Sequence, residues 1–330
     1  ERPKNTACKI PTDFMNPPRL LSETGCMDPQ DPRKPGPALI PYEVASPLWS
    51  DAAEKERFFA IPDGTRIRVR DCTKTPSDCD PAVTRASEND GDFTLPDGSV
   101  TVKAFKIGGR YVETRLLVKF DADNWFGYSY EWNDAQTDAV VRPDEVNGFM
   151  KNVPDGKGGQ QSWHFPSRAQ CLQCHTGAAG VSLGLEASQL NVTHRYPNGV
   201  EENQLEAFER VGLIESALRR PFPQAFPNPA DTRLPVTLRA RSYLETNCAI
   251  CHRPKGNFEQ IDLRFGLPVG QMKICNEQPE KGDLGVPGAL RLIPGMPGKS
   301  LVSLRMKTLE QGRMPQTCSA RSSSRTGSPG

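Results

Sequence analysis

The chain has 330 residues, of which 41 are Lys or Arg and 40 are Asp or Glu, so its net charge is +1 at pH 7. This balance leaves no basic excess for binding a nucleic-acid backbone and argues against nucleic-acid partners. The 36% hydrophobic content can form a buried core, and no apolar run approaches the roughly 20 residues of a transmembrane segment.

Pro and Gly are frequent, with 31 and 28 residues, and they interrupt nearly every segment of the chain. We therefore expect a loop-rich protein of two or three domains, because single cores rarely grow beyond about 250 residues. The sequence begins abruptly at Glu1. Such a start is typical of a mature N-terminus after removal of a signal peptide, which predicts an exported protein.

Residues 1–40 are rich in Pro and carry no hydrophobic periodicity, most plainly over 28–37. This composition predicts an extended arm on the surface of the protein. Cys8 and Cys26 are close enough in sequence to tie the arm with a disulfide.

Residues 41–150 carry strand signals. Residues 66–70 alternate with a period of two, as do parts of 99–107 and 111–120, and 125–132 is aromatic and hairpin-like. Asp-Gly and Gly-Gly turns separate these runs. The simplest architecture is an antiparallel β-sandwich-like domain or barrel.

The pattern becomes helical after a Gly-rich, linker-like stretch at 154–159. Residues 201–220 place apolar side chains at three- and four-residue spacings before a proline, which predicts one helix, and a second is predicted over 238–251. The expected fold class is therefore α+β and multidomain, with two small α-helical units at 151–235 and 236–330 after the β-rich domain.

The pentapeptide C-x-x-C-H occurs twice, whereas the composition gives about 0.004 copies by chance. The spacing is that of c-type haem attachment, in which two thiols bond the vinyl groups of one porphyrin and the following His ligates the iron. Each helical unit is then expected to be cytochrome c-like, with one covalent haem c. The predicted attachment and ligand residues are Cys171, Cys174 and His175 in the first motif, and Cys248, Cys251 and His252 in the second.

Two other interpretations of the paired cysteines remain open. A zinc ribbon normally has roughly 15–20 residues between its cysteine pairs. Cys174 and Cys248 are several times farther apart than that, and zinc gives no reason for a His after each pair. A thioredoxin-like redox pair needs a βαβ context that neither motif has.

Covalent haem is normally added outside the cytoplasmic membrane, where disulfides persist, so we expect a periplasmic or extracellular protein. The six other cysteines could pair, although the sequence does not choose among the pairings and free buried thiols are the alternative. Proximity along the chain suggests Cys8 with Cys26, Cys72 with Cys79, and Cys275 with Cys318.

The sixth iron ligand decides whether a haem carries electrons or binds a substrate. For the second haem we prefer Met314, which lies well downstream of His252 and directly precedes a proline. This is the usual arrangement in small cytochrome c domains. Met296 is the competing candidate, whereas Met306 fits better in a helix core.

For the first haem the candidate sixth ligands are the two remaining histidines. His164 lies shortly before Cys171, and His194 follows His175 closely enough to fold back over the same haem. Met150 is a weaker third candidate. If both histidines were ligands, both haems would have two His ligands and lower potentials than with Met.

Further stretches carry a family resemblance: PYEV at 41–44, SPLWSD at 46–51, VETRLLV at 112–118, GYSYEWN at 127–133, FPSRAQ at 165–170, LGL at 183–185 and QLN at 189–191. With these stretches the chain resembles, over about 40–315, a bacterial family of exported diheme c-type cytochromes. The resemblance implies a β-rich N-terminal region joined to haem-bearing helical units, and extracytoplasmic electron transfer without a defined substrate.

The C-terminal tail departs from this family pattern. Residues 319–330 consist of Ser, Arg, Gly and Pro with Ala and Thr and have no apolar face, whereas a final helix usually follows the Met-Pro pair. Our hypothesis is a frameshift within 316–330, which would also remove Cys318 as a partner for Cys275.

The leading function is electron transfer between redox partner proteins. The β-rich domain would be a docking platform for such a partner, or for further copies of the chain in a homo-oligomer or conducting filament. The alternative is a diheme enzyme such as a peroxidase with one open haem, for which Glu186 is an available acid or base. A third class is a carbohydrate or surface adhesin that uses exposed aromatic residues, namely Trp125, Tyr128 and Trp132.

Overall fold

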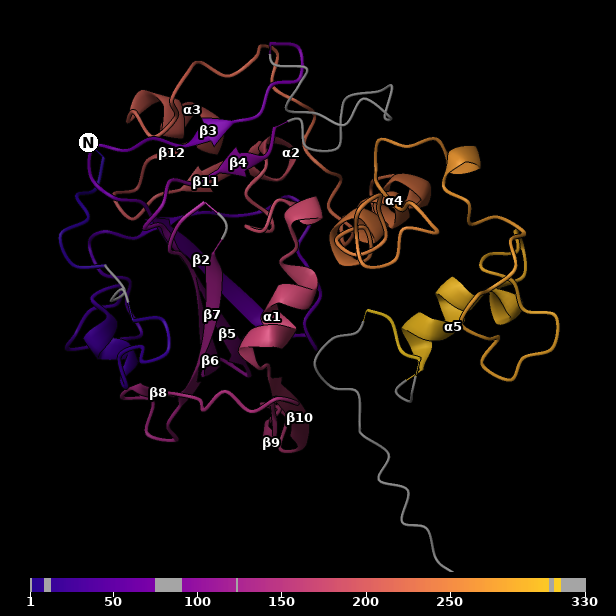
Figure 1. Ribbon diagram of the computed structural model, residues 1–330, viewed down its shortest axis with the longest axis horizontal. Helices are drawn as coiled ribbons and strands as arrows, with labels where there is room; N and C mark the ends of the chain where they lie inside the picture. The colour runs from indigo at the N-terminus through magenta and orange to yellow at the C-terminus, as the bar shows by residue number, and fades with distance from the viewer. Residues whose placement is uncertain (1, 9–12, 75–90, 123, 309–311, 316–330) are drawn as a thin grey trace, which may run out of the picture.

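A six-stranded antiparallel sheet forms the centre of the protein, in the order β1-β2-β5-β6-β7-β8 (Figure 1). The computed structural model describes residues 2–8, 13–74, 91–122, 124–308 and 312–315. The strands of the sheet are β1 (Ile40–Pro41), β2 (Glu54–Ala60), β5 (Val100–Ile107), β6 (Arg110–Lys119), β7 (Trp125–Trp132) and β8 (Ala139–Val141). The predicted strands at 99–107, 111–120 and 125–132 are therefore confirmed.

The two faces of this sheet differ in chemistry because successive side chains of a strand point to opposite sides. One face is apolar and closely packed. Its buried residues include Phe58, Ala60, Val100, Val102, Leu116, Val118, Tyr128 and Tyr130. The intervening residues, among them Lys103 and Arg115, belong to the opposite face and line a cavity.

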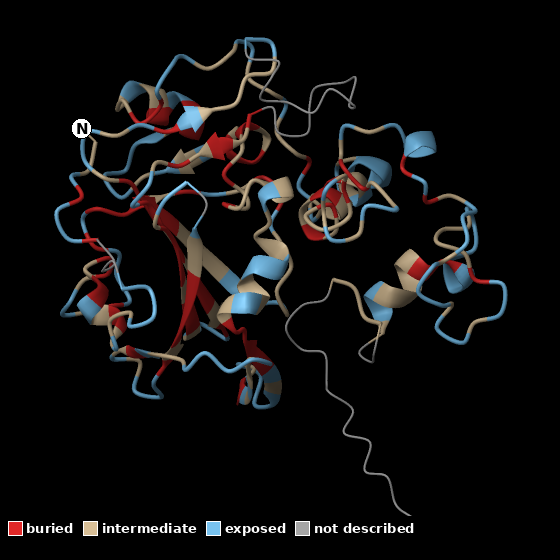
Figure 2. Ribbon diagram, viewed as in Figure 1, coloured by how far each residue is buried: buried red, intermediate tan, exposed pale blue. Residues whose placement is uncertain are grey.

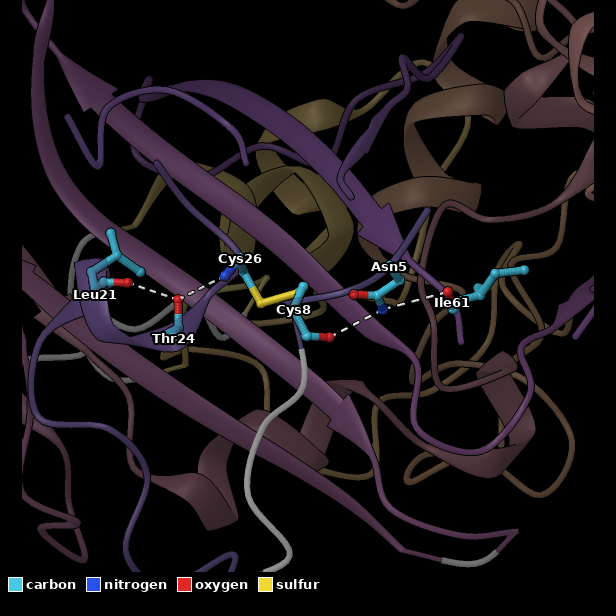
Figure 3. The surroundings of a disulfide bond; sticks show 6 residues. All are labelled: Asn5, Cys8, Leu21, Thr24, Cys26 and Ile61. Atoms are coloured by element: carbon cyan, nitrogen blue, oxygen red, sulfur yellow. Dashed lines mark hydrogen bonds between the residues drawn. A yellow bond between two sulfur atoms is a disulfide. The ribbon is translucent and has the colours of Figure 1, made fainter. Parts of the chain in front are cut away.

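The Pro-rich N-terminal segment covers the apolar face of the sheet. Leu21, Cys26 and Met27 are buried in the same core cluster as the strands. The predicted disulfide between Cys8 and Cys26 is present, and Thr24 accepts a hydrogen bond from the Cys26 amide beside it (Figure 3). This arm is thus an integral layer of the fold, including the short helix η1 (Leu21–Thr24).

A second core lies beside the sheet, where two short strand pairs and two short helices meet. These are β3 (Arg68–Val69) with β4 (Phe93–Thr94), β11 (Thr193–Arg195) with β12 (Glu201–Asn203), α2 (Ala187–Leu190) and α3 (Gln204–Arg210). The predicted helix over 201–220 is limited to α3. It ends because Gly212 adopts a φ of 74° and the Ile67 amide donates to the Leu213 carbonyl oxygen, so that tertiary pairing replaces the helix.

The predicted linker at 154–159 is the turn of a β-hairpin. It joins β9 (Phe149–Pro154) to β10 (Gln160–Phe165). The Asp155 carboxylate accepts hydrogen bonds from the amides of Lys157 and Gly159. The linker prediction for this stretch is wrong, because the chain turns there and continues directly into the next strand.

The C-terminal part contains two α-helices and long irregular segments. Figure 1 shows α4 (Val236–Asn247) and α5 (Leu301–Lys307) beside the β-rich body, with α1 (Arg168–Cys174) at the side of the sheet that faces them. The small core of the C-terminal part includes Ala249, Leu263, Met272 and Ile274. Most of the buried hydrophobic residues lie before α4 in the chain, whereas the C-terminal part is mainly intermediate or exposed (Figure 2). Short 3-10 helices occur at η3 (Gly177–Ala179), η4 (Val269–Gln271) and η5 (Pro297–Lys299).

The predicted fold class is wrong. The described residues form a mostly β protein with one large sheet rather than a sandwich, and they contain five α-helices, the longest of 12 residues. Two separate α-helical cytochrome c-like units are not seen, because the segments after each motif are largely turns and loops. None of these helices has the length and hydropathy needed to cross a bilayer.

The remaining cysteines are only partly described. Cys72 takes part in a disulfide, but Cys79, its predicted partner, lies outside the described residues. Cys275 is a half-buried free thiol, and Cys318 likewise lies outside them. The frameshift hypothesis concerns 316–330, which the structure does not describe.

Candidate functional site

The two C-x-x-C-H motifs lie at helix ends. The first occupies the last turn of α1, which begins with a capping box in which Ser167 and Gln170 bond each other's backbone amides, and His175 is its C-cap. The second follows α4, whose last residue is Asn247. The end of α1 therefore places His175 directly, whereas the second motif begins at the C-cap of α4, Cys248.

Both motifs line one cavity of about 450 Å³. All six predicted attachment and ligand residues belong to its lining: Cys171, Cys174, His175, Cys248, Cys251 and His252. The cavity wall opposite the motifs is the sheet face that carries Thr101, Lys103, Phe105, Arg115 and Leu117. Two motifs that are distant in sequence thus converge on a single site against the sheet.

The motifs also contact one another directly. Asn257 Nδ2, just after the second motif, donates to the Gln173 carbonyl oxygen inside the first at 2.7 Å. A hydrogen bond between the Cys174 and Cys251 thiols raises the pKa of Cys174 and lowers that of Cys251. Burial raises the pKa of Cys248 to about 12. The buried Cys248 and the Cys174 thiol therefore stay protonated at neutral pH.

The first motif is seated on the sheet at a glycine. A Cβ added at Gly127 of β7 would lie 2.8 Å from Cys171 Sγ and 2.9 Å from its Cβ. No larger residue fits there without moving α1, because real Cβ atoms do not approach within 3.0 Å. Gly127 thus forms a cradle for the first attachment cysteine.

His175 is prepared as a neutral metal ligand. Its Nδ1 lies 2.6 Å from the Val181 carbonyl oxygen, which can only accept, so Nδ1 carries the proton and Nε2 keeps its lone pair. Burial, and then the charge of Lys103, lower the pKa of His175 to about 4. A neutral imidazole in this tautomer can bind iron through Nε2 at neutral pH.

His252 lies between two cavities. It lines the large cavity and a second, apolar one of about 150 Å³ that is also lined by Cys248, Leu263, Val302 and Met314. Its Nδ1 is buried without a hydrogen-bond partner among the described residues, and burial lowers its pKa. The ring centroid lies 5.5 Å from that of Phe258.

Three cations stand side by side on the cavity face of the sheet. Arg57, Lys103 and Arg115 occupy paired positions on β2, β5 and β6. Arg115 forms a bidentate ion pair with the buried Glu113, with both N–O distances 2.8 Å. Lys103 has no ion pair within the described ranges, and burial, with the neighbouring cations Arg57 and Lys55, lowers its pKa to about 7. Like charges in paired positions destabilise a sheet, so this row favours a bound anion.

The sequence-based ligand candidates separate clearly in space. Met314 lines both cavities, and His164 of β10 lines the large one, with Nε2 3.2 Å from the Asn147 carbonyl oxygen. His194 is on β11, packs edge-on against Tyr196 and is not part of the described lining of either cavity. Met296 and Met150 are 55% and 40% exposed and line neither cavity. Met306 lines the smaller cavity.

The residues present fit two c-type haems better than the alternatives. A porphyrin is flat and apolar with two carboxylates, and the large cavity combines apolar walls with the cations Lys103 and Arg115. Two thiol pairs and two neutral histidines face it. For a zinc ribbon, no group of three or more His, Cys, Asp or Glu side chains is arranged to hold a metal ion among the described residues.

The sequence-based reasoning missed Gly127, Lys103 and the cation row. A signal for Lys103 exists: the run VTVKAFKI of β5 places a Lys among alternating apolar residues, which indicates a strand with one polar face. Comparisons with protein-family models, curated proteins and solved structures returned no match.

Proposed function

We propose that the chain is an exported diheme c-type cytochrome that carries electrons between redox partners in the periplasm or outside the cell. The observation that supports this best is the convergence of both C-x-x-C-H motifs on one cavity. The motifs supply covalent attachment and proximal ligands, and bound haem supplies one-electron chemistry. The protein holds the haems and excludes water from them.

The chain's residues would divide this work between two haem sites. Cys171, Cys174 and His175 would hold the first haem against β5, β6 and β7, and Lys103 would supply a cation in the same cavity. The second motif would hold the other haem toward the 150 Å³ cavity, whose lining is mostly apolar. An apolar surrounding favours the less charged state of the haem iron, and nearby cations raise its potential.

Haem content tests the proposal directly. The protein is exported in a host with the c-type maturation machinery, and its haem is measured as the pyridine haemochrome and by intact mass. We expect two covalent haems, one in the Cys171→Ala/Cys174→Ala variant and one in the Cys248→Ala/Cys251→Ala variant. Absence of covalent haem from the wild type would refute the proposal, and zinc found in its place would favour the ribbon.

The sixth ligand of the first haem distinguishes a carrier from an enzyme. His164 lines the cavity, whereas His194 does not. We therefore propose His164 as that ligand. Low-temperature EPR of the oxidised protein should give two low-spin haems. The His164→Ala variant should then show a high-spin signal that the His194→Ala variant does not.

A diheme peroxidase is the second candidate, and a small cavity of about 60 Å³ favours it. Glu186 lines this cavity, which shares Lys103, Ser182 and Leu183 with the large one. Burial, followed by the charges of Asp92 and Glu245, raises the pKa of Glu186 well above its usual value, as a general acid requires. A high-spin haem in the wild type, with turnover of hydrogen peroxide that Glu186→Gln abolishes, would favour the enzyme.

The filament and the adhesin remain predictions. The arm expected to reach a neighbouring copy packs on its own sheet, where Tyr128 and Tyr130 donate to the carbonyl oxygens of Phe14 and Pro18. Tyr128 and Trp132 are buried rather than presented to a carbohydrate. Both findings support the carrier over these two functions.

A further inference from the structure

The Gly-Arg-Met-Pro segment that contains Met314 is attached to the N-terminal part of the chain. Arg313 Nη2 donates to Asp51 Oδ1 at 3.1 Å, across 262 positions of sequence. The two side chains are only 10% and 18% exposed. The Arg313 guanidinium also lies over the Trp49 ring, 5.0 Å from its centroid. Such a partly desolvated, charge-assisted contact fixes geometry better than an exposed ion pair.

The segment that receives Arg313 is itself fixed beside the second motif. The Trp49 amide donates to Asn247 Oδ1 at 2.7 Å. Asn247 is 2% exposed and directly precedes Cys248. Lys55 Nζ donates to the Leu48 carbonyl oxygen at 2.7 Å. Residues 48–51 therefore form a rigid bridge between β2 and the end of α4.

The other side of the Met314 segment is held by α5. The Met314 amide donates to the Arg305 carbonyl oxygen, and Arg305 Nη1 donates to the Gly312 carbonyl oxygen, both at 2.9 Å. With the contacts from α5 alone, the Met314 segment would be attached on one side only. The ion pair with Asp51 attaches its other side, at the cavity that His252 also lines.

We propose that Asp51 and Arg313 are positioning residues that hold Met314 in place as the sixth ligand of the second haem. This inference rests on the proposed function, because it requires a haem on Cys248 and Cys251. If Asp51 and Arg313 have this role, the strength of the Met–iron bond depends on the β-rich part of the protein. The sixth ligand of the second haem is then controlled by residues from both ends of the chain.

Competition by free imidazole tests the proposal on the haem-loaded protein. Imidazole must displace Met314 from ferric iron, so its apparent affinity rises as the methionine-bound state weakens. The titration is followed at the methionine-to-iron charge-transfer band, which imidazole binding at the first haem does not affect. We expect Asp51→Asn and Arg313→Gln each to lower the apparent dissociation constant about tenfold, as loss of a hydrogen bond to a charged group implies.

Two controls accompany these variants. Asp231→Asn breaks an exposed ion pair with Arg233, whose side chain is 88% exposed, and should leave the titration unchanged. Met314→Ala should abolish the band. Circular dichroism and haem content establish that each variant is folded and loaded.

The outcomes separate this inference from the function on which it rests. In one outcome, Met314→Ala removes the wild-type band, but Asp51→Asn and Arg313→Gln leave the imidazole affinity unchanged. This outcome would overturn the positioning role of Asp51 and Arg313 and leave the proposed cytochrome function intact. A wild type with two haems but no such band would overturn Met314 as ligand and the inference with it. A wild type without covalent haem would overturn the proposed function itself.

Discussion

Replacing Gly127 by Ala tests whether the first motif is seated on the sheet as described. The added Cβ would lie 2.8 Å from Cys171 Sγ, whereas ordinary contacts begin at 3.4 Å, so α1 must move outward by at least about 0.6 Å. Overpacking of this kind costs about 1–3 kcal/mol, and Ala regains about 0.5–1 kcal/mol over Gly within a strand. The net expectation is a loss of about 1 kcal/mol, and at most about 2.5 kcal/mol, in the free energy of unfolding.

Denaturant unfolding of the haem-loaded protein, followed by far-ultraviolet circular dichroism, measures this loss. Gly266→Ala is the matched control, because a Cβ there meets no atom within 4 Å and its φ is not left-handed. The absorption and circular dichroism of the first haem should change in Gly127→Ala alone. If both variants unfold within about 0.5 kcal/mol of the wild type with unchanged haem spectra, α1 does not pack on β7 and the cavity is wrong.

Three further predictions concern charge and cross-linking. Lys103→Met should lower the potential of the first haem in a spectroelectrochemical titration below about pH 6, where Lys103 with its pKa of about 7 is charged. The expected change is about 70 mV, for a unit charge about 10 Å away at an effective dielectric near 20. Above the ordinary pKa of a glutamate, Glu186 keeps its proton in the folded chain but loses it in the unfolded chain. The free energy of unfolding therefore falls as pH rises. Glu186→Gln should make this fall less steep, by up to about 1.4 kcal/mol per pH unit in denaturant titrations. Replacing Cys8 and Cys26 by Ala should cost about 3 kcal/mol, from the sequence separation of 18, in the same unfolding assay.

The sequence predicted the elements whose signals are local. The alternation in β5 and β6 and the aromatic run of β7 indicate strands because a sheet with one buried face requires a period of two. The C-x-x-C-H spacing predicts attachment residues because both thiols of a haem c site must reach one porphyrin, and this stays a prediction. Neither inference depends on what the rest of the chain does.

Prediction failed where tertiary contacts override local pattern. The apolar spacing over 201–220 suits a helix, yet Leu213 and Ile214 instead extend along Ile67. The Pro-rich arm has no periodicity because its buried residues, such as Leu21 and Met27, reach the core from turns. Two helical haem units were expected because each motif was considered alone, whereas both share the wall of the β-sheet.

The shared wall bears on how electrons would move. The contact between Cys174 and Cys251, together with the hydrogen bond from Asn257 to Gln173, places the second cysteine of each motif at the same point. In the proposed cytochrome these two cysteines would attach different haems, so the two attachment points would be adjacent. Electron transfer between the haems would then take place inside one chain, and a partner protein would need to reach only one of them. This arrangement follows from the docking of both motifs on one sheet and is invisible in sequence, where the β11–β12 hairpin, α3 and α4 all intervene between the motifs.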